Sequence, residues 1–279
     1  MLIKSFSKIN LSLRINKKLQ KRKLHQIQSY FFLTSIHDVI NIKKNRKIRD
    51  SVIFKGKFSK NINKKNNTIV NTLNILRKEK IISNYYSVIV NKKIPVFSGM
   101  GGGTSNAASI IKYFIKGKIR KNLINIVQKK IGSDLRLFFF KKGFLVNLDQ
   151  VKNFRKNYNF NILIVYPYLR CSTKDIYSKV SKFSKMSKLN YNNLKDKKKF
   201  LKIITKEKND LQLIVENKFP LVKKLVSQLQ RLEGCYFSRM SGSGSACYGV
   251  FKSKKSAKNA LIKIKQIFPK YWCAVAKTI

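Results

Sequence analysis

The interpretation of this chain starts from one stretch, Pro95-Val96-Phe97-Ser98-Gly99-Met100-Gly101-Gly102-Gly103-Thr104-Ser105-Asn106-Ala107-Ala108. Four glycines in five positions allow backbone N–H groups to converge without obstruction by Cβ atoms. A strand pattern at residues 87–90 precedes the stretch, and one apolar helix face at positions 107, 110, 111, 114 and 115 follows it. A strand, a glycine loop and a helix N-terminus in this order predict a site that holds a phosphate chain.

The surrounding pattern predicts an α+β fold. The glycine stretch is not a Walker A loop, because no Gly-Lys-Ser/Thr appears. Strands and helices are mixed without a clean β-α-β alternation, and no G-x-G-x-x-G fingerprint opens the chain, which argues against a Rossmann sheet. A length of 279 residues suggests about two domains. The polar texture near residues 147–156 suits a boundary, so we expect domains over 1–148 and 149–279.

Composition excludes several classes of protein. Hydrophobic residues make up 43% of the chain and aromatic residues 11%, which rules out a chain disordered throughout. No apolar run approaches the roughly 18 residues of a membrane span, and residues 1–8 lack the apolar stretch of a signal peptide. The four cysteines are far apart and the only histidines are His25 and His37, which leaves no zinc cage or disulfide framework. We expect a soluble cytoplasmic protein.

The net charge is extreme. Lysine and arginine number 62 against 11 acidic residues, a balance of +51. Such an excess usually suggests nucleic acid or an anionic membrane. The lysines nevertheless spread along the whole chain together with asparagine and isoleucine, as an AT-rich coding sequence supplies them, and no basic block stands apart. We attribute the charge mainly to composition and expect neither nucleic acid nor membrane as a partner, with a nucleic-acid surface and acidic small ligands as alternatives.

Three further segments are candidates for chemistry. Ser241-Gly242-Ser243-Gly244-Ser245 is either a flexible hairpin or a second loop that closes over phosphates. Asp134 stands directly before the apolar run Leu137–Phe140, a predicted buried strand, whereas most other acids lie among lysines and are interpreted as solvated. A carboxylate beside a buried strand needs a role or a structural partner. Lys8 is predicted to open the first strand, where a lysine can also be a solvated charge.

Taken together and in order, these motifs resemble those of the GHMP small-molecule kinases. The set is K-I-N-L from Lys8, P-x-x-x-G-M-G-G-G-T-S-N-A-A from Pro95, G-S-D from Gly132 and M-S-G-S-G-S-A from Met240. It extends over nearly the whole chain, and the G-G-G-x-S-N-A-A form of the loop is its most specific element. Leu24-His25 and the residues 172–177 are also similar to segments with which one family member binds cytidine.

The resemblance implies a fold and a reaction. The fold would have two α+β domains, an N-terminal one like domain 2 of ribosomal protein S5 and a C-terminal ferredoxin-like α/β sandwich, with the active site in the cleft between them. The reaction would transfer the γ-phosphoryl group of ATP, with Mg²⁺, to a hydroxyl of a cytidine diphosphate derivative. The chain would be a monomer or a weak homodimer. A kinase of the mevalonate, phosphomevalonate or homoserine type, or a basic nucleic-acid-binding protein, is the alternative.

The resemblance also implies residue roles. Asp134 would orient or deprotonate the hydroxyl, and Lys8 would hold the carboxylate ionised and offset developing charge. His25 would read the cytosine edge and Tyr177 would stack on its ring. The residues implied to bind ATP are Pro95, Gly99, Gly101, Gly102, Gly103, Thr104, Ser105 and Asn106. Those implied to bind substrate are Asn10, His25, Thr173, Tyr177, Gly242, Ser243 and Gly244, and no protein ligand to a metal is assigned.

Five positions, in three segments, depart from the family's pattern. Phe6-Ser7 stands where the family usually has Pro-Ala before the lysine. Ser133 stands where the family has alanine before the aspartate, and Arg136 stands where it has a proline. Leu24 stands where an aromatic residue is expected, so only an apolar wall is offered on one side of the cytosine.

Overall fold

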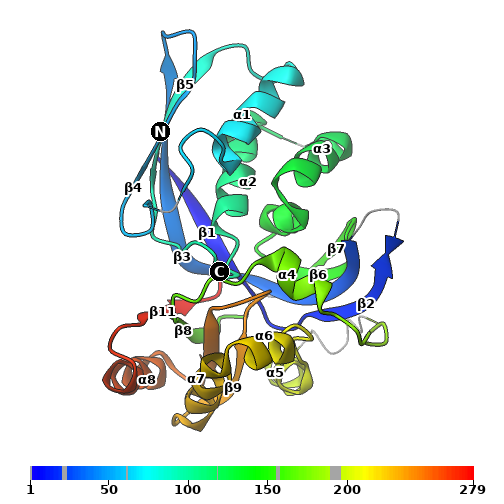
Figure 1. Ribbon diagram of the computed structural model, residues 1–279, viewed down its shortest axis with the longest axis vertical. Coiled ribbons are helices and arrows are strands. Elements are labelled where there is room, and N and C mark those ends of the chain that lie inside the picture. Colours follow the sequence, from blue (N-terminus) through cyan, green and yellow to red (C-terminus); the bar gives the residue numbers. More distant parts are fainter. Residues whose placement is uncertain (1, 21–23, 61, 118, 155–157, 189–195) are drawn as a thin grey trace. The chain divides into compact units, whose positions relative to one another are not determined.

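The computed structural model describes residues 2–20, 24–60, 62–117, 119–154, 158–188 and 196–279 (Figure 1). The chain divides into two compact units, the first made of Met1–Lys8, Ile36–Val96 and Gly101–Lys141, the second of Ile9–Ser35, Phe97–Met100 and Lys142–Ile279. The division therefore falls within the first strand, after Lys8, and within the glycine stretch, after Met100. The domain boundary expected after residue 148 stays a prediction.

The first unit places three helices beside a mixed set of strands. Strand β1 (Leu2–Asn10) pairs with the long strand β3 (Leu24–Asn45). The second half of β3 pairs antiparallel with β5 (Tyr85–Asn91), which pairs in parallel with β4 (Ser51–Lys55). Helices α1 (Thr68–Lys78), α2 (Gly102–Phe114) and α3 (Lys121–Ile131) lie on one side of these strands (Figure 1).

Local sequence explains these elements. In β5, Val88 and Val90 are buried while Ile89 between them is exposed, the period-two pattern of a strand with one covered face. Helix α1 begins at a capping residue, because the side chain of Asn67 accepts hydrogen bonds from the backbone N–H of Ile69 at 3.1 Å and of Val70 at 3.0 Å.

The predicted strand at Leu137–Phe140 is wrong. These residues belong mainly to a 3-10 helix, η2 (Ser133–Phe139), which packs against α2 and α3. Leu135, Leu137 and Phe138 are all buried, and no period-two pattern separates them. A short apolar run is compatible with a buried strand or a buried helical turn, so the sequence alone did not distinguish the two.

The second unit contains an antiparallel sheet in the order β11-β8-β10-β9. Its strands are β8 (Asn161–Tyr166), β9 (Cys235–Met240), β10 (Cys247–Phe251) and β11 (Trp272–Lys277). Helix α7 (Pro220–Arg231) packs on β9 and β10, and α8 (Lys254–Ile267) packs on β8 and β11. With the four strands counted along the chain this is the order 4-1-3-2 of a ferredoxin-like sandwich, so the α+β class and the C-terminal architecture are confirmed.

The other strands of the second unit pair with the first half of β3 or with each other. Strand β2 (Arg14–Leu19) pairs antiparallel with residues 24–28, and β6 (Lys142–Asn147) pairs with residues 29–32 and with β7 (Gln150–Asn153). Three helices, α4 (Thr173–Ser178), α5 (Lys197–Lys206) and α6 (Gln212–Lys218), complete the unit. Over the part of the chain that the structure describes, no helix has both the length and the apolar character needed to cross a bilayer.

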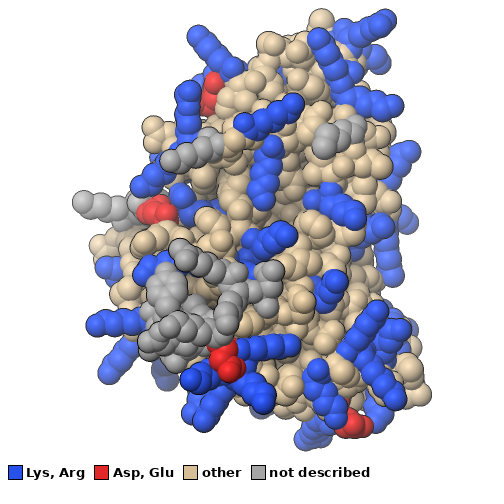
Figure 2. Space-filling view, turned by 180° about the vertical axis from the view of Figure 1, so that it is seen from behind, with Lys and Arg blue, Asp and Glu red and all other residues tan. Residues whose placement is uncertain are grey.

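Basic side chains are dispersed over the surface. Figure 2 shows lysine and arginine spread over the described part of one face, with few acidic side chains between them. This distribution agrees with the even spread of lysine along the sequence.

Candidate active site

The glycine stretch forms the N-terminus of α2. Gly101 is the N-cap residue and has left-handed backbone angles, with φ at 68° and ψ at 28°. The first N–H groups of a helix have no acceptor within it, and the first turn of α2 contains no acidic side chain. The amides of Gly102, Gly103 and Thr104 at this helix start are therefore suited to a negatively charged group.

Close packing also explains why residues 101 and 102 are glycines. A Cβ atom on Gly101 would lie 2.6 Å from Cζ of Phe138, and one on Gly102 would lie 2.9 Å from Cγ2 of Ile94. Both positions are closed by neighbouring side chains. Gly103 differs, because a Cβ atom there would meet Thr68 at an ordinary 3.4 Å. Glycine at 103 is therefore not demanded by the protein's own packing.

Lys8 and Asp134 form an ion pair beside this helix start. Nζ of Lys8 lies 3.0 Å from Oδ2 of Asp134, and the two side chains are 2% and 34% exposed. Cε of Lys8 lies 3.5 Å from the Cβ position of Gly101, so the lysine stem runs against the N-cap of α2. Lys8 is buried inside β1 rather than at its start, so the interpretations as a strand-opening residue or a solvated charge are wrong. The carboxylate of Asp134 is therefore held by a buried ammonium group and is still accessible to solvent.

A second buried ion pair lies in the same unit and was not found from the sequence. The carboxylate of Asp38, in β3, pairs with Nζ of Lys92, and both side chains are almost fully buried. The other oxygen of Asp38 accepts hydrogen bonds from the backbone N–H of Lys93 at 2.7 Å and of Ile94 at 2.9 Å. The sequence analysis does not single out Asp38. The available signal was its position directly before Val39-Ile40, inside an apolar strand pattern.

The Asp38–Lys92 pair is hydrogen-bonded to the first turns of α2. Asn106 of α2 donates from Nδ2 to Asp38 at 3.0 Å and accepts at Oδ1 from Lys92 at 3.1 Å. Nζ of Lys92 lies 3.3 Å from the Cβ position of Gly102, so its positive charge is close to the first residue of α2. Burial lowers the pKa of Lys92, and the Asp38 carboxylate acts in the opposite direction.

Two residues expected to bind ATP fasten α2 to β1. The hydroxyl of Ser105 donates to the carbonyl of Phe6 at 2.6 Å and lies 2.8 Å from the hydroxyl of Ser5. Nδ2 of Asn106 also donates to Ser5 Oγ at 2.9 Å. Pro95 is buried at the other end of the stretch. The side chains of Ser105 and Asn106 are thus engaged within the protein, and the backbone N–H of Ser105 donates to the carbonyl of Gly101 at 2.8 Å. Their roles in binding ATP stay predictions.

The loop at residues 241–245 is buried in the second unit. Gly99, with φ at 75°, packs so closely on it that a Cβ atom would collide with the carbonyl of Ser241. Nδ2 of Asn209 donates to the carbonyls of Met240 at 2.9 Å and Gly242 at 2.8 Å. The hydroxyls of Thr173 and Ser243 are 2.9 Å apart. These contacts fix the loop, so the alternative of a flexible hairpin is wrong.

Asn10 lies against the same loop. Its backbone N–H donates to Oγ of Ser241 at 3.3 Å, and its carbonyl accepts from the hydroxyl of Tyr248 at 2.9 Å. Its side chain is buried, and Nδ2 donates to Oγ of Ser29 at 2.8 Å. Its role at the substrate stays a prediction.

The structure brings His25 and Tyr177 together although 152 positions separate them in the sequence. Their ring centroids are 5.4 Å apart at an interplanar angle of 34°. A third ring, Phe183, lies 6.3 Å from His25 at 30°, and the sequence analysis did not single it out. Burial, and then the charge of Lys18 across the β2–β3 pair, lowers the pKa of His25. An aromatic residue within a lysine- and serine-rich segment was the available signal for Phe183.

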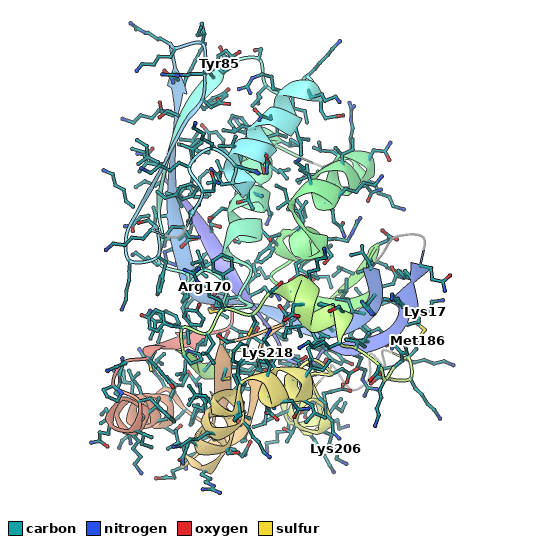
Figure 3. All side chains as sticks on the ribbon, viewed as in Figure 1. Lys17, Tyr85, Arg170, Met186, Lys206 and Lys218 are labelled. Atoms are coloured by element: carbon teal, nitrogen blue, oxygen red, sulfur yellow. The ribbon has the colours of Figure 1, made fainter. Side chains whose placement is uncertain are left out.

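Helix α4 carries Tyr177, the ring that contacts His25. The side chain of Ser172 caps the helix by accepting from the backbone N–H of Asp175 at 3.3 Å. Asp175 also forms an ion pair with Lys218 of α6 (Figure 3). Tyr177 is half-buried and Leu24, at the start of β3, is exposed.

Comparison with known proteins gives consistent matches. A family model described as "GHMP kinases C terminal" matches residues 186–270. The 4-diphosphocytidyl-2-C-methyl-D-erythritol kinase of Pelagibacter ubique (strain HTCC1062) is 40% identical over 282 residues, covering 99% of this chain and 98% of that protein. The kinase of the same name from Wolbachia sp. subsp. Drosophila simulans (strain wRi) is 30% identical over 281 residues, covering 97% and 96%.

Solved structures share the fold. A crystal structure of 4-(cytidine 5'-diphospho)-2C-methyl-D-erythritol kinase matches with a TM-score of 0.76 at 19% identity, covering 99% of both chains. A crystal structure of mevalonate kinase matches with a TM-score of 0.69 at 15% identity, covering 100% of this chain and 99% of that one. The chain belongs to the GHMP kinases and, among them, to the family of the 4-diphosphocytidyl-2-C-methyl-D-erythritol kinases. The predicted family is confirmed, and with it an ATP-dependent kinase of small molecules.

Proposed function

We propose that the chain transfers the γ-phosphoryl group of ATP to the 2-hydroxyl of 4-diphosphocytidyl-2-C-methyl-D-erythritol, a step of non-mevalonate isoprenoid biosynthesis. The observation that carries the proposal is the Lys8–Asp134 pair beside the open start of α2. The 40% identity to the Pelagibacter kinase over 99% of this chain supports the choice of substrate. We also propose that the chain acts in the cytoplasm as a monomer or weak homodimer, without a nucleic-acid partner.

The phosphates of ATP would lie at the start of α2. Backbone N–H groups of Gly102, Gly103 and Thr104 would donate to phosphate oxygens, and the helix dipole would favour their negative charge. The buried ammonium of Lys92, paired with Asp38, lies near Gly102 and is the cationic end of that pair closest to the helix start. Phosphoryl transfer asks a protein mainly for positioning and for compensation of charge, and this arrangement supplies both.

Asp134 would act on the substrate hydroxyl. Its carboxylate is one-third exposed, so a hydroxyl can approach it, while Lys8 holds one oxygen in place from the protein interior. In the reaction the substrate oxygen forms a bond to the γ-phosphorus, the bond from that phosphorus to the β,γ-bridging oxygen breaks, and Asp134 takes the hydroxyl proton. ADP leaves with the bridging oxygen. Lys8 offsets charge that develops around the transferred group.

Mg²⁺ would accompany ATP. Among the described residues no group of three or more His, Cys, Asp or Glu side chains could hold a metal ion by itself. Mg²⁺ commonly binds through phosphate oxygens and one or two carboxylates, and Asp134 is the carboxylate beside the start of α2 that fits such a role. The ion would neutralise phosphate charge.

The cytidine end of the substrate would bind in the second unit. We propose that His25 hydrogen-bonds the cytosine edge and Tyr177 stacks on the base, a role that their 5.4 Å ring separation supports. The amides and hydroxyls of Gly242, Ser243 and Gly244 would close over ligand phosphates, with Thr173 holding Ser243 in position. Asn10 would contact the substrate.

Release of ADP by the purified protein tests this function. The cytidylylated erythritol, mevalonate and homoserine are offered separately with ATP and Mg²⁺, and the phosphorylated position is read by phosphorus NMR. We expect turnover with the cytidylylated substrate alone, and Asp134→Asn serves as the matched control for contaminating kinases. Turnover of mevalonate or homoserine in preference to the cytidylylated compound would refute the proposed substrate.

A further inference from the structure

Phe183 is an exposed ring on a backbone that is fixed at the next residue. The ring is 48% exposed. The backbone N–H of Ser184 donates to the carbonyl of Ile15 at 2.7 Å, and its own carbonyl accepts from Nδ2 of Asn16 at 3.1 Å. The hydroxyl of Ser184 donates to Oδ2 of Asp210 at 2.7 Å. Three hydrogen bonds at one residue fix the backbone next to Phe183, whose ring stays half exposed.

A second attachment lies three residues further along. The amide side chain of Gln28, which is buried, accepts from the backbone N–H of Ser187 at 2.7 Å and donates to its carbonyl at 3.0 Å. Between these attachments, Sδ of Met186 accepts from Nε2 of Gln26 at 3.8 Å, and Gln26 is the register partner of Lys17 in β2 (Figure 3). The segment therefore follows β2 and β3, and the position of Phe183 is set by strands rather than by its own packing.

The orientation of the ring suits a planar ligand. Phe183 and Tyr177 are inclined to the imidazole of His25 by only 30° and 34°. A base that hydrogen-bonds by its edge to His25 and lies near the plane of the imidazole would be inclined to each ring by a similarly small angle, which allows stacking. Offset stacking of this kind is favourable for aromatic groups.

We propose that Phe183 supplies the second aromatic face of the base site, in place of the ring that Leu24 lacks. The inference rests on the proposed function, because it names a further residue for recognition of the cytosine. Leu24 is the first residue of β3, is 42% exposed and offers only an aliphatic surface. Phe183 reaches the same histidine from a different segment whose backbone is held by hydrogen bonds, which lowers the entropic cost of stacking.

Replacement of Phe183 tests the inference. Stacking on one base changes affinity by about tenfold or more when the ring is removed. We expect Phe183→Ala to raise the KM for the cytidylylated substrate by about tenfold, with kcat and the KM for ATP within about twofold of the unaltered protein. Phe183→Tyr should behave like the unaltered protein and Phe183→Leu like Phe183→Ala. Met186→Ala, on the same segment, is the matched control and should leave both KM values within about twofold.

The outcomes separate this inference from the proposed function. Calorimetric titration of the unaltered protein with cytidine 5'-diphosphate, together with turnover, establishes that the base site exists. If the unaltered protein binds and turns over but Phe183→Ala keeps its substrate KM, or Phe183→Leu matches the unaltered protein, only the inference is overturned. Equal weakening of ATP and substrate would also overturn it, because that result indicates a structural role. If the unaltered protein neither binds cytidine 5'-diphosphate nor turns over, the proposed function fails and the inference fails with it.

Discussion

The two partners of the Lys8–Asp134 pair should respond differently to substitution, because only one of them is buried. Asp134→Asn keeps the shape of the side chain but places an uncharged amide beside the ammonium of Lys8, which is 2% exposed. Lys8→Met keeps the stem that runs against Gly101 and leaves a carboxylate that is 34% exposed and accessible to water. Both changes should lower kcat, and Asp134→Asn should also destabilise the fold more.

The solvent exposure of each partner determines how much stability its replacement costs. Removing one partner of a fully buried ion pair costs about 3 to 5 kcal/mol, whereas an exposed pair is worth about 0 to 1 kcal/mol. Since Asp134 is one-third exposed, water can partly replace it, and we expect Asp134→Asn to lower the free energy of unfolding by about 2 kcal/mol. Lys8→Met should lower it by less than about 1 kcal/mol. Loss of a general base costs about 10²- to 10⁴-fold in rate, so kcat should fall by that factor in Asp134→Asn.

Two measurements check this reasoning. Urea denaturation followed by circular dichroism gives the free energy of unfolding, and ADP release at saturating ATP gives kcat. Near-normal turnover by Asp134→Asn would remove Asp134 from proton transfer. A larger loss of stability in Lys8→Met than in Asp134→Asn would refute the electrostatic argument, since it would mean that packing of the lysine stem outweighs the buried charge.

Three further results are expected. Gly101→Ala should lower the free energy of unfolding by about 1 to 3 kcal/mol in urea, because its Cβ would lie 2.6 Å from Phe138 at a φ of 68°; an equally stable variant would contradict the close packing. Asp38→Asn should cost about 3 kcal/mol in the same assay by removing the counter-charge of buried Lys92, and an unchanged midpoint would contradict it. The pKa of His25 lies below the ordinary 6.5, so the ring is neutral at pH 7.5 and gains a proton only as pH falls; the KM for the cytidylylated substrate should then rise, and His25→Gln should abolish that rise.

Local chemistry made several elements predictable from the sequence. The glycine stretch predicted the start of a helix because only glycine tolerates the φ of 68° at Gly101 without strain. Asn67 is of the residue type that commonly caps a helix, and it stands directly before α1. Both signals lie within a few residues of the structure they produce.

Contacts between distant segments were the part that could not be predicted from residue patterns alone. Asp38 pairs with Lys92, 54 positions away, and no local pattern specifies that meeting. Phe183 joins His25 because hydrogen bonds from Ser184 and Ser187 place its segment along β2 and β3. His25 and Tyr177 were matched only through resemblance to a family, and their separation of 5.4 Å became known from the fold.

The large positive charge acts on the approach of ligands rather than on the geometry of the site. The chain carries only 11 acidic residues, and those that contact the site are already engaged: Asp38 with Lys92 and Asp134 with Lys8. Asp50 with Arg77 and Glu207 with Arg14 are paired in the same way elsewhere. The excess of 51 positive charges must therefore come from lysines and arginines beyond these pairs, many of which cover the surface in Figure 2.

Salt screens charges on that surface over about 8 Å at physiological ionic strength, whereas a buried pair is screened much less. ATP and a diphosphocytidyl compound are both polyanions, so a dispersed positive field raises their rate of encounter without selecting between them. Selection then has to come from short-range contacts, which are the N–H groups at the start of α2 for the phosphates and the rings around His25 for the base. A strongly basic composition is thus compatible with a specific small-molecule kinase, because the residues that discriminate are few and are held by buried contacts that the surface charge does not disturb.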